Sequence, residues 1–306
     1  MMLSMKTKKL FLLPAILLAG CSVDSHEKLS ILVPTGAPAV AFASFLNDSK
    51  FQVIDEPKNI VAQMVNENVD IAVLPTNLGV QQIAKGLKYK LASTITFGNL
   101  YICSTGLDED DLMGDDDYIV SFQENAVPDK IFKSVYDVGV DYYATNAQEA
   151  AKCLKLKKDV VNNKDVEYVL MAEPAISKLE SSGTNFSIYA NLQSEYKAKY
   201  ENQQIFQASI FVRDSLSHSQ VDPYLGRVKT YVNSLLSNPR LLEKAKQLDE
   251  NAETTLGIDI AATVSAIEKD NALGIGYEVA INHKTEIDTF LNVFGMSTTN
   301  EEIYFK

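Results

Sequence analysis

The stretch ILVPTGAPAVAFASFL, residues 31–46, combines three local signals in one short segment. An apolar, β-branched run comes first, an uncharged turn PTGAP follows, and small apolar residues with helical spacing close the segment. Pro38 suits the first turn of a helix, where a missing N–H group loses no hydrogen bond. The segment therefore predicts a strand, a tight turn and a helix, in that order.

The same plan recurs at two later places, residues 73–84 (VLPTNLGVQQIA) and residues 169–179 (VLMAEPAISKL). Around these junctions, apolar runs alternate with helical stretches, which predicts an α/β protein with mainly parallel sheets. The short, nearly all-apolar strands indicate that helices cover both faces of a sheet. The predicted strands are residues 29–33, 51–55, 70–74, 91–97, 118–122, 140–144, 166–171 and 186–190.

The three junctions carry small or polar residues, among them Thr35, Thr76 and Asn77. In open α/β sheets, ligands bind outside the carboxyl ends of the strands, where helix N-termini offer unpaired N–H groups. Each junction by itself could be a plain tight turn. Because three of them share the pattern, we expect them to form the rim of a ligand pocket.

Residues 1–20 have the layout of an export signal, with lysines first and then an apolar run that ends in LAG before Cys21. The run is shorter than the roughly 20 apolar residues of a spanning helix. It resembles a bacterial lipoprotein signal, which implies that cleavage leaves Cys21 as the acylated N-terminus, with residues 21–28 as a short tether. An ordinary secretory signal with an incidental cysteine is the alternative.

The composition of the mature chain is typical of a globular protein. About 285 residues form two domains or one large domain. The 28 Lys and Arg residues against 40 Asp and Glu residues give a net charge of -12, which argues against a nucleic-acid partner. Besides Cys21, only Cys103 and Cys153 remain. A disulfide is possible in an exported protein, although we expect two buried free thiols.

Metal and catalytic motifs are scarce in the sequence. His26, His218 and His283 have no second ligand at helical or hairpin spacing, so we expect no metal site. The acidic run at 108–117 lacks the closing glutamate of a calcium loop and is interpreted as a solvated loop, with adventitious calcium as the alternative. No GxSxG, SxxK or HExxH motif marks a nucleophile or a metalloprotease, and we expect neither an enzyme nor a cofactor.

A family resemblance rests on the lipoprotein leader, the PTGAP turn, DIAVLPTN at 70–77, FGNLY at 97–101 and MAEP at 171–174. Together they resemble the substrate-binding lipoproteins of bacterial ABC importers, in the group that binds nitrate, alkanesulfonates or thiamine precursors. The resemblance implies a type II periplasmic-binding-protein fold, an α/β fold in which two chain crossings join two lobes around a ligand cleft.

The resemblance also implies the boundaries of the lobes. Lobe one would comprise residues 29–101 and 206–306, and lobe two residues 102–205. The crossings would lie within residues 91–106 and 203–216. Amphipathic spacing predicts helices over 224–248 and 260–271, with Asn238-Pro239 as punctuation, and these would pack on the outside of lobe one.

A protein of this family would capture a small molecule between its lobes and deliver it to a membrane permease, as a lipid-anchored monomer facing the periplasm or the cell exterior. The candidate ligand-binding residues are those at the strand ends and crossings. Asn146 could instead only cap a helix, and Tyr101 could belong to the core. The candidates are Thr35, Gly36, Ala37, Thr76, Asn77, Asn99, Tyr101, Glu124, Thr145, Asn146, Glu173 and Gln207.

Charge usage narrows the expected ligand. The arginines Arg213, Arg227 and Arg240 all lie away from the candidate strand ends, whereas an arginine fork is the usual partner of an anion. Glu124 and Glu173 instead favour a neutral or cationic nitrogen-containing molecule, such as a thiamine-precursor-like heterocycle. Two other functions stay open: an enzyme of cofactor biosynthesis with the same fold, and a surface adhesin or sensor lipoprotein that serves no transporter.

Overall fold

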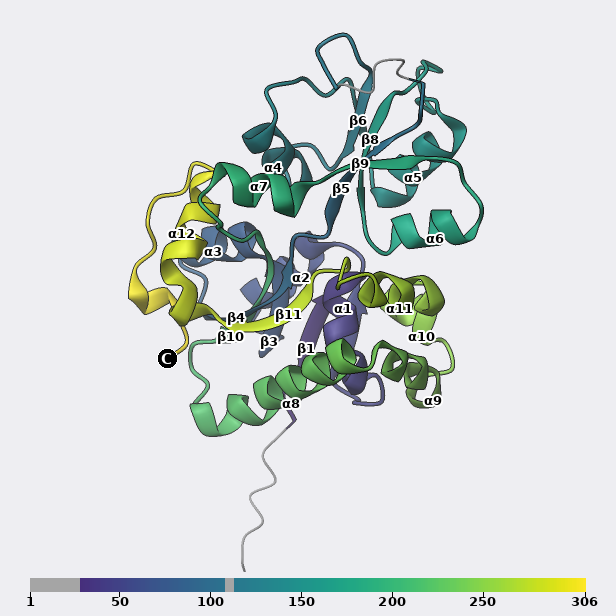
Figure 1. The fold of residues 1–306 in the computed structure, drawn as a ribbon. Coiled ribbons are helices and arrows are strands. Elements are labelled where there is room, and N and C mark those ends of the chain that lie inside the picture. The colour runs from purple at the N-terminus through teal and green to yellow at the C-terminus, as the bar shows by residue number, and fades with distance from the viewer. Residues whose placement is uncertain (1–27, 108–112) are drawn as a thin grey trace, which may run out of the picture.

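A computed structural model describes residues 28–107 and 113–306 of the chain. The predicted signal peptide, Cys21 and the tether as far as Glu27 lie outside the described residues, as does part of the acidic run at 108–117. Figure 1 shows two lobes, one above the other, each built around one sheet with helices packed against it. In the described part of the chain, no helix combines the length and the apolar character needed to cross a membrane.

Lobe one contains a sheet with the strand order β11-β4-β10-β3-β1-β2. Strand β10 enters this sheet after the chain has passed through lobe two, and β11 joins its edge near the C-terminus. The strands are β1 Ile31–Pro34, β2 Phe51–Ile54, β3 Ile71–Pro75, β4 Tyr89–Phe97, β10 Phe206–Arg213 and β11 Ile275–Val279.

Lobe two contains the second sheet, with the order β7-β6-β8-β5-β9. All five strands lie in one continuous part of the chain, between the two crossings. They are β5 Leu100–Ser104, β6 Ile119–Phe122, β7 Tyr142–Ala144, β8 Tyr168–Ala172 and β9 Ser187–Asn191.

The prediction of mainly parallel sheets is wrong. Strands β1, β2 and β3 pair in parallel, as do β6, β7 and β8. Strand β10, however, is antiparallel to β3 and β4, strand β11 is antiparallel to β4, and β5 is antiparallel to β8 and β9. The reason is the edge at which the chain enters the sheet. Strands β5 and β10 follow a crossing and β11 follows the segment after Glu268, and all three start at the edge where the parallel strands end.

The pairing registers bring the strand ends of lobe one to a single edge. Ala208 of β10 pairs with Pro75 at the end of β3, and Phe206 pairs with Phe97 at the end of β4. In lobe two, Leu100 at the start of β5 pairs with Ala172 at the end of β8. Since the chain passes from Phe97 to Leu100 within a few residues, the two sheets face each other with their strand-end edges.

Helices flank both sheets, and two hydrophobic clusters hold the layers together. One cluster lies between the lobe-one sheet and the helices α1, α8 and α11 and includes Val33 and Ile210. The other covers the opposite face of that sheet and continues through Leu100 and Phe206 at the crossings into lobe two. The helices are α1 Ala37–Ala41, α2 Pro57–Val65, α3 Thr76–Ala84, α4 Val127–Val135, α5 Ala147–Leu156, α6 Ala175–Ser181, α7 Leu192–Lys199, α8 His218–Ser237, α9 Ala245–Leu248, α10 Ala252–Leu256, α11 Ile260–Glu268 and α12 Lys284–Asn292.

The C-terminal helices cover lobe one, as predicted, but α8 begins before the predicted segment. Ser217 and Gln220 form a capping box at its start, and Pro223 is accommodated inside the helix. Helix α8 ends at Ser237 with Asn238 as its C-cap, as the Asn238-Pro239 pair predicts. Cys103 and Cys153 are both buried and free, so they form no disulfide with each other.

Candidate functional site

The first junction, between β1 and α1, is a tight turn bound into lobe one. Gly36 has φ 89° and ψ −148°, a conformation that essentially requires glycine. Its N–H donates to the Leu256 carbonyl at 2.9 Å, and the Thr35 N–H donates to the Ile54 carbonyl at 3.3 Å. Thr35 and Gly36 are partly buried at the strand-end edge, whereas Ala37 is 4% exposed and belongs to the core of lobe one.

The second junction, between β3 and α3, introduces a chain of buried hydroxyl groups. The Thr76 hydroxyl contacts the Ser209 hydroxyl at 2.7 Å, and the Ser209 hydroxyl contacts that of Thr94 at 2.8 Å. All three residues are fully buried, so Thr76 connects α3 to strands β10 and β4 inside lobe one. Asn77 lies next to Thr76, and its Oδ1 is buried without a hydrogen-bond partner among the described residues.

The third junction, at the end of β8, is joined directly to the first crossing. The Asn99 side-chain Nδ2 donates to the Glu173 carbonyl at 3.0 Å, and the Glu173 N–H donates to the Asn99 carbonyl at 3.0 Å. The Asn99 N–H also points to Oε1 of Gln207, near the start of β10, at 3.5 Å. Asn99 thus connects the first crossing to β10 of lobe one and to Glu173 at the junction in lobe two.

Two oxygen atoms at this point have no partner within the described chain: Oδ1 of Asn99 and Oγ1 of Thr96. Both residues are almost fully buried. The orientation of the Asn99 amide is fixed by the bond from its Nδ2, so the unpaired atom is the carbonyl oxygen, an acceptor. A buried acceptor without a donor is energetically costly, and such atoms are typical of places where a bound molecule completes the hydrogen bonding.

The Glu173 carboxylate is hydrogen-bonded to Ser177 of helix α6. Its Oε2 accepts from the Ser177 N–H at 3.0 Å, and its Oε1 accepts from the Ser177 hydroxyl at 2.9 Å. Burial raises the pKa of the Glu173 carboxyl, and the two bonds from Ser177 oppose the rise. The Glu173 side chain therefore binds the first turn of helix α6 and also places a titratable group at the strand-end edge of lobe two.

Tyr101 connects the first crossing to lobe one. Its hydroxyl donates to the Ala272 carbonyl at 3.3 Å, and the side chain is partly buried against the core. Burial, together with the charges of Glu173 and Asp270, raises the pKa of Tyr101 to about 12, so the phenol is neutral at physiological pH. Tyr101 thus contributes to the core, the alternative considered from sequence, and makes a polar contact as well.

The other candidates of lobe two are exposed. Glu124 follows β6 at the surface, and Thr145 and Asn146 follow β7. The Thr145 hydroxyl donates to the Glu149 carboxylate at 2.5 Å, and Asn146 Oδ1 accepts from the Glu149 N–H at 2.9 Å. Asn146 therefore caps helix α5, which is the structural role that the sequence had left open.

In the described chain, no arginine lies at this strand-end edge. Arg213 pairs with Asp70 at 2.5 Å at the far end of β10. The other two arginines, Arg227 and Arg240, pair with Asp48 and Glu268. Within residues 28–107 and 113–306, no cluster of three or more His, Cys, Asp or Glu residues could hold a metal ion.

The sequence reasoning missed several residues of the site. Thr94, Thr96 and Ser209 lie inside apolar strands, and Ser177 lies inside α6. The signal was present, because hydroxyl residues interrupt otherwise apolar runs in LASTITF and QASIFVR. An ion pair between Lys269, which follows α11, and Glu180 of α6 was also missed, although it connects the two lobes directly.

No family model matches the chain, and no curated protein matches it in sequence. Solved structures, by contrast, match it over most of its length. An ABC transporter structure from Parabacteroides distasonis has a TM-score of 0.71 at 17% identity and covers 91% of this chain and 99% of its own. The periplasmic aliphatic sulphonate binding protein SsuA from Escherichia coli has a TM-score of 0.63 at 12% identity, with 89% and 87% covered.

A third similar structure is a conserved gene product of Candida albicans whose family exhibits the generic periplasmic binding protein fold. It has a TM-score of 0.54 at 11% identity and covers 90% of this chain and 93% of its own. At these identities the similarity establishes the fold. The chain has the two-lobed periplasmic-binding-protein fold that was predicted from its sequence.

Proposed function

We propose that the protein is an extracytoplasmic solute-binding lipoprotein, which captures a small molecule between its two lobes and delivers it to the permease of an ABC importer. The observation that carries the proposal is the pair of facing strand-end edges. There Asn99 joins the first crossing to Gln207 of β10 and to Glu173, while buried oxygens of Asn99 and Thr96 lack partners among the described residues. The fold supports the same conclusion, because two similar structures are an ABC transporter and a sulphonate binding protein.

The mechanism is closure of the lobes around the ligand. The lobes are joined by two crossings, at 98–99 between β4 and β5 and at 200–205 between α7 and β10, so lobe two can rotate against lobe one without breaking either sheet. A ligand that contacts both edges binds the closed form more tightly than the open form, and this difference drives closure. We propose the sequence-derived boundaries for the lobes, with residues 29–101 and 206–306 in lobe one and 102–205 in lobe two, except that Leu100 and Tyr101 pair within the sheet of lobe two.

The contacting residues are proposed to be those of the facing edges. From lobe one and the crossing, the contributing residues would be Thr35, Gly36, Asn77, Asn99 and Gln207. From lobe two they would be Glu124 and Glu173. Thr76, Ala37, Thr145 and Asn146 act through the architecture of the site, since their side chains are buried in lobe one or engaged on α5.

We propose a neutral or cationic ligand with N–H donors. The unpaired Asn77 and Asn99 oxygens accept hydrogen bonds, as do carboxylates such as Glu124 and Glu173. The three arginines are paired elsewhere, so an arginine fork for a strongly anionic ligand is missing from this edge. Acylation at Cys21 would keep the protein at the outer face of the membrane, near the permease, and so raise its effective concentration there.

A thermal-shift screen tests this function. A ligand at a hundred times its Kd adds about 2.7 kcal/mol to the free energy of unfolding, which raises Tm by several degrees for a chain of this size. We expect amines, amidines and aminopyrimidines to include stabilising compounds, and the stabilising compound to be recovered unchanged. Stabilisation by nitrate and sulfonates alone would contradict the ligand class, and turnover of the bound compound would favour an enzyme.

A further inference from the structure

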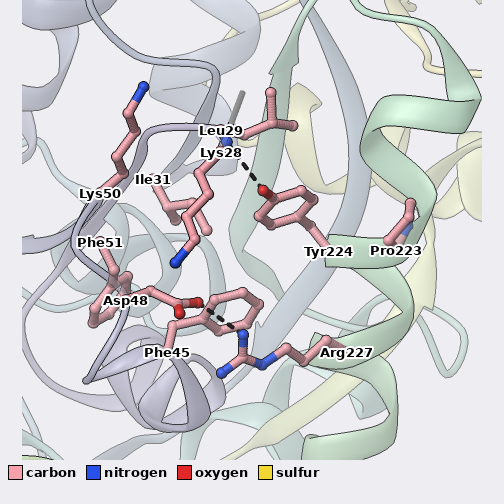
Figure 2. Close-up of a pocket in the computed structure, with 10 residues that line it drawn as sticks. All are labelled: Lys28, Leu29, Ile31, Phe45, Asp48, Lys50, Phe51, Pro223, Tyr224 and Arg227. Carbon is pink, nitrogen blue, oxygen red and sulfur yellow. Dashed lines mark hydrogen bonds and ion pairs between the residues drawn. The ribbon is translucent and has the colours of Figure 1, made fainter. Parts of the chain in front are cut away.

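A second concave site lies at the opposite end of lobe one. It is a pocket of about 330 Å³, lined by residues that precede or begin β1 and β2 and by residues of helix α8 (Figure 2). Strand β1 starts here with Ile31 and ends at the edge that faces lobe two, and its four residues span about 13 Å. The pocket is therefore separated from the proposed solute site by the length of the lobe-one sheet.

Aromatic side chains form one wall of the pocket. The Phe45 and Tyr224 rings stack with centroids 6.3 Å apart and an interplanar angle of 12°, and the Tyr224 hydroxyl accepts from the Leu29 N–H at 3.0 Å. The Arg227 guanidinium lies over the Phe45 ring, 3.9 Å from its centroid, and pairs with Asp48 at 2.7 Å. Figure 2 shows Tyr224 beside Leu29, and Phe45 close to Asp48 and Arg227.

The charge of the lining differs from that of the whole protein. Lys28, Lys50 and Arg227 line the pocket together with one carboxylate, Asp48, although the chain as a whole carries a net charge of -12. Lys28 is exposed and makes no ion pair with any residue in the described part of the chain. The occupant that this lining favours is an anion attached to an apolar body, because aromatic and cationic groups stand side by side.

The position of the pocket indicates where such an anion would come from. The described chain begins at Lys28, and seven peptide units separate it from Cys21, a reach of at most about 25 Å. If Cys21 is acylated, the pocket lies within that distance of the membrane. Tyrosine is enriched at lipid–water interfaces, and Tyr224 is partly exposed beside the pocket lysines. Each cation near an anionic leaflet adds about 1 kcal/mol of attraction.

We infer that this pocket docks lobe one on the headgroup of an anionic phospholipid, an inference that rests on the proposed lipoprotein function. The phosphate lies near Lys28, and the glycerol and upper acyl carbons lie against Tyr224. Docking at this end holds the strand-end edge of lobe one away from the lipid. Solutes can therefore reach the interlobe site while the protein stays docked on the membrane near its permease.

Vesicle flotation of the unacylated mature chain, with Cys21→Ser, tests the inference. We expect binding to vesicles of phosphatidylglycerol mixed with phosphatidylcholine, and little binding to phosphatidylcholine alone. Lys28→Gln should lower the partition coefficient about fivefold, whereas Lys28→Arg should leave it unchanged. Lys155→Gln on α5 of lobe two, also at an exposed lysine, is the matched control and should have no effect.

Tyr224→Ala distinguishes binding in the pocket from binding to a general basic surface. It should lower vesicle binding only if the aromatic wall contacts the lipid. Its Tm shows whether the variant is folded. Equal loss with Lys28→Gln and Lys155→Gln would overturn the inference, as would equal binding to both vesicle types. So would stabilisation by inorganic phosphate or glycerol phosphate without vesicle binding, which would indicate a site for soluble anions. The thermal shift with the interlobe ligand, measured on the same variants, reports separately on the proposed function.

Discussion

Asn99 and Glu173 exchange two hydrogen bonds, from the Asn99 side-chain amide to the Glu173 carbonyl and from the Glu173 N–H to the Asn99 carbonyl, each 3.0 Å long. The pair continues the ladder that begins with Leu100 and Ala172, and it lies where β5 leaves the first crossing. The pair therefore lies where the chain passes from lobe one into lobe two.

Asn99→Ala should destabilise the protein. The substitution leaves the buried Glu173 carbonyl without its side-chain donor, and a buried unsatisfied group costs about 1–3 kcal/mol. Urea unfolding measures the loss as a lower free energy of unfolding. A change within about 0.5 kcal/mol, the usual effect of a surface substitution, would show that the pair does not hold the junction together.

Gly36→Ala should also destabilise the protein, by about 1–3 kcal/mol, because φ 89° with ψ −148° is a backbone region that alanine avoids. Steric contact is not the cause, since an added Cβ would meet nothing within 4 Å. Gly139→Ala is the matched control, because Gly139 has equally open surroundings and no positive φ. Similar losses in the two variants would contradict the assignment of strain to Gly36.

Much of the fold could be predicted because its strands and helices follow local patterns. All eight predicted strands are present within a few residues of their expected bounds. Strand β11 at Ile275–Val279 was missed, since glycines at 274 and 276 interrupt its pattern and three of its five residues are only partly buried. Strand β10 lies in a segment predicted as a crossing rather than as a strand. Strand direction was predicted wrongly because direction depends on the edge at which the chain enters the sheet, and no local pattern records that.

The candidate site was harder to predict than the fold. Polar residues at strand ends were recognisable, but their roles depend on neighbours distant in sequence. Thr76 bonds to Ser209, and Asn99 bonds to Glu173, across separations of 133 and 74 residues. Asn146 is the exception, because its helix cap involves only Glu149, three residues later, and this possibility could be stated from the sequence alone.

The pH dependence of stability should change in Glu173→Gln. Because burial raises the pKa of Glu173, the folded state holds its proton to higher pH than the unfolded state, whose carboxyl titrates near 4.5. As pH rises above 4.5 and through the raised pKa, the wild type therefore loses stability relative to Glu173→Gln. Urea unfolding of both proteins from pH 4.5 to neutral pH measures this.

Glu124→Gln is the reference variant for that series, since its carboxyl is exposed at the same edge of lobe two. The difference between wild type and Glu173→Gln should move in favour of the variant with rising pH. A difference that stays constant would mean that the pKa of Glu173 is the same in the folded and unfolded states. A difference that moves in favour of the wild type would mean that the carboxylate is stabilised in the folded state.

The ion pair between Lys269 and Glu180 should slow the release of bound solute. It joins the end of α11 in lobe one to α6 in lobe two, so opening the lobes breaks it. Both side chains are nearly half exposed, and pairs of this kind contribute up to about 1 kcal/mol, or at most about a fivefold change in the dissociation rate. Lys269→Glu should speed release of a ligand found by thermal shift.

The exchanged double variant, Lys269→Glu with Glu180→Lys, is the control for that measurement, because it restores the pair with its charges reversed. Stopped-flow dissociation should return toward the wild-type rate. If both single variants and the double variant release ligand at the same rate, the contact has no part in holding the lobes closed.

Native mass spectrometry of the protein, purified from its host without denaturation, tests the central claim most directly. We predict one small molecule per chain, bearing N–H donors, which is lost on denaturation and which raises Tm when added back. Asn99→Asp should alter its retention, because the change adds a negative charge beside the unpaired Asn99 oxygen and replaces the Nδ2 donor to the Glu173 carbonyl. A protein that carries no small molecule, and that no nitrogen-containing solute stabilises, would contradict the account.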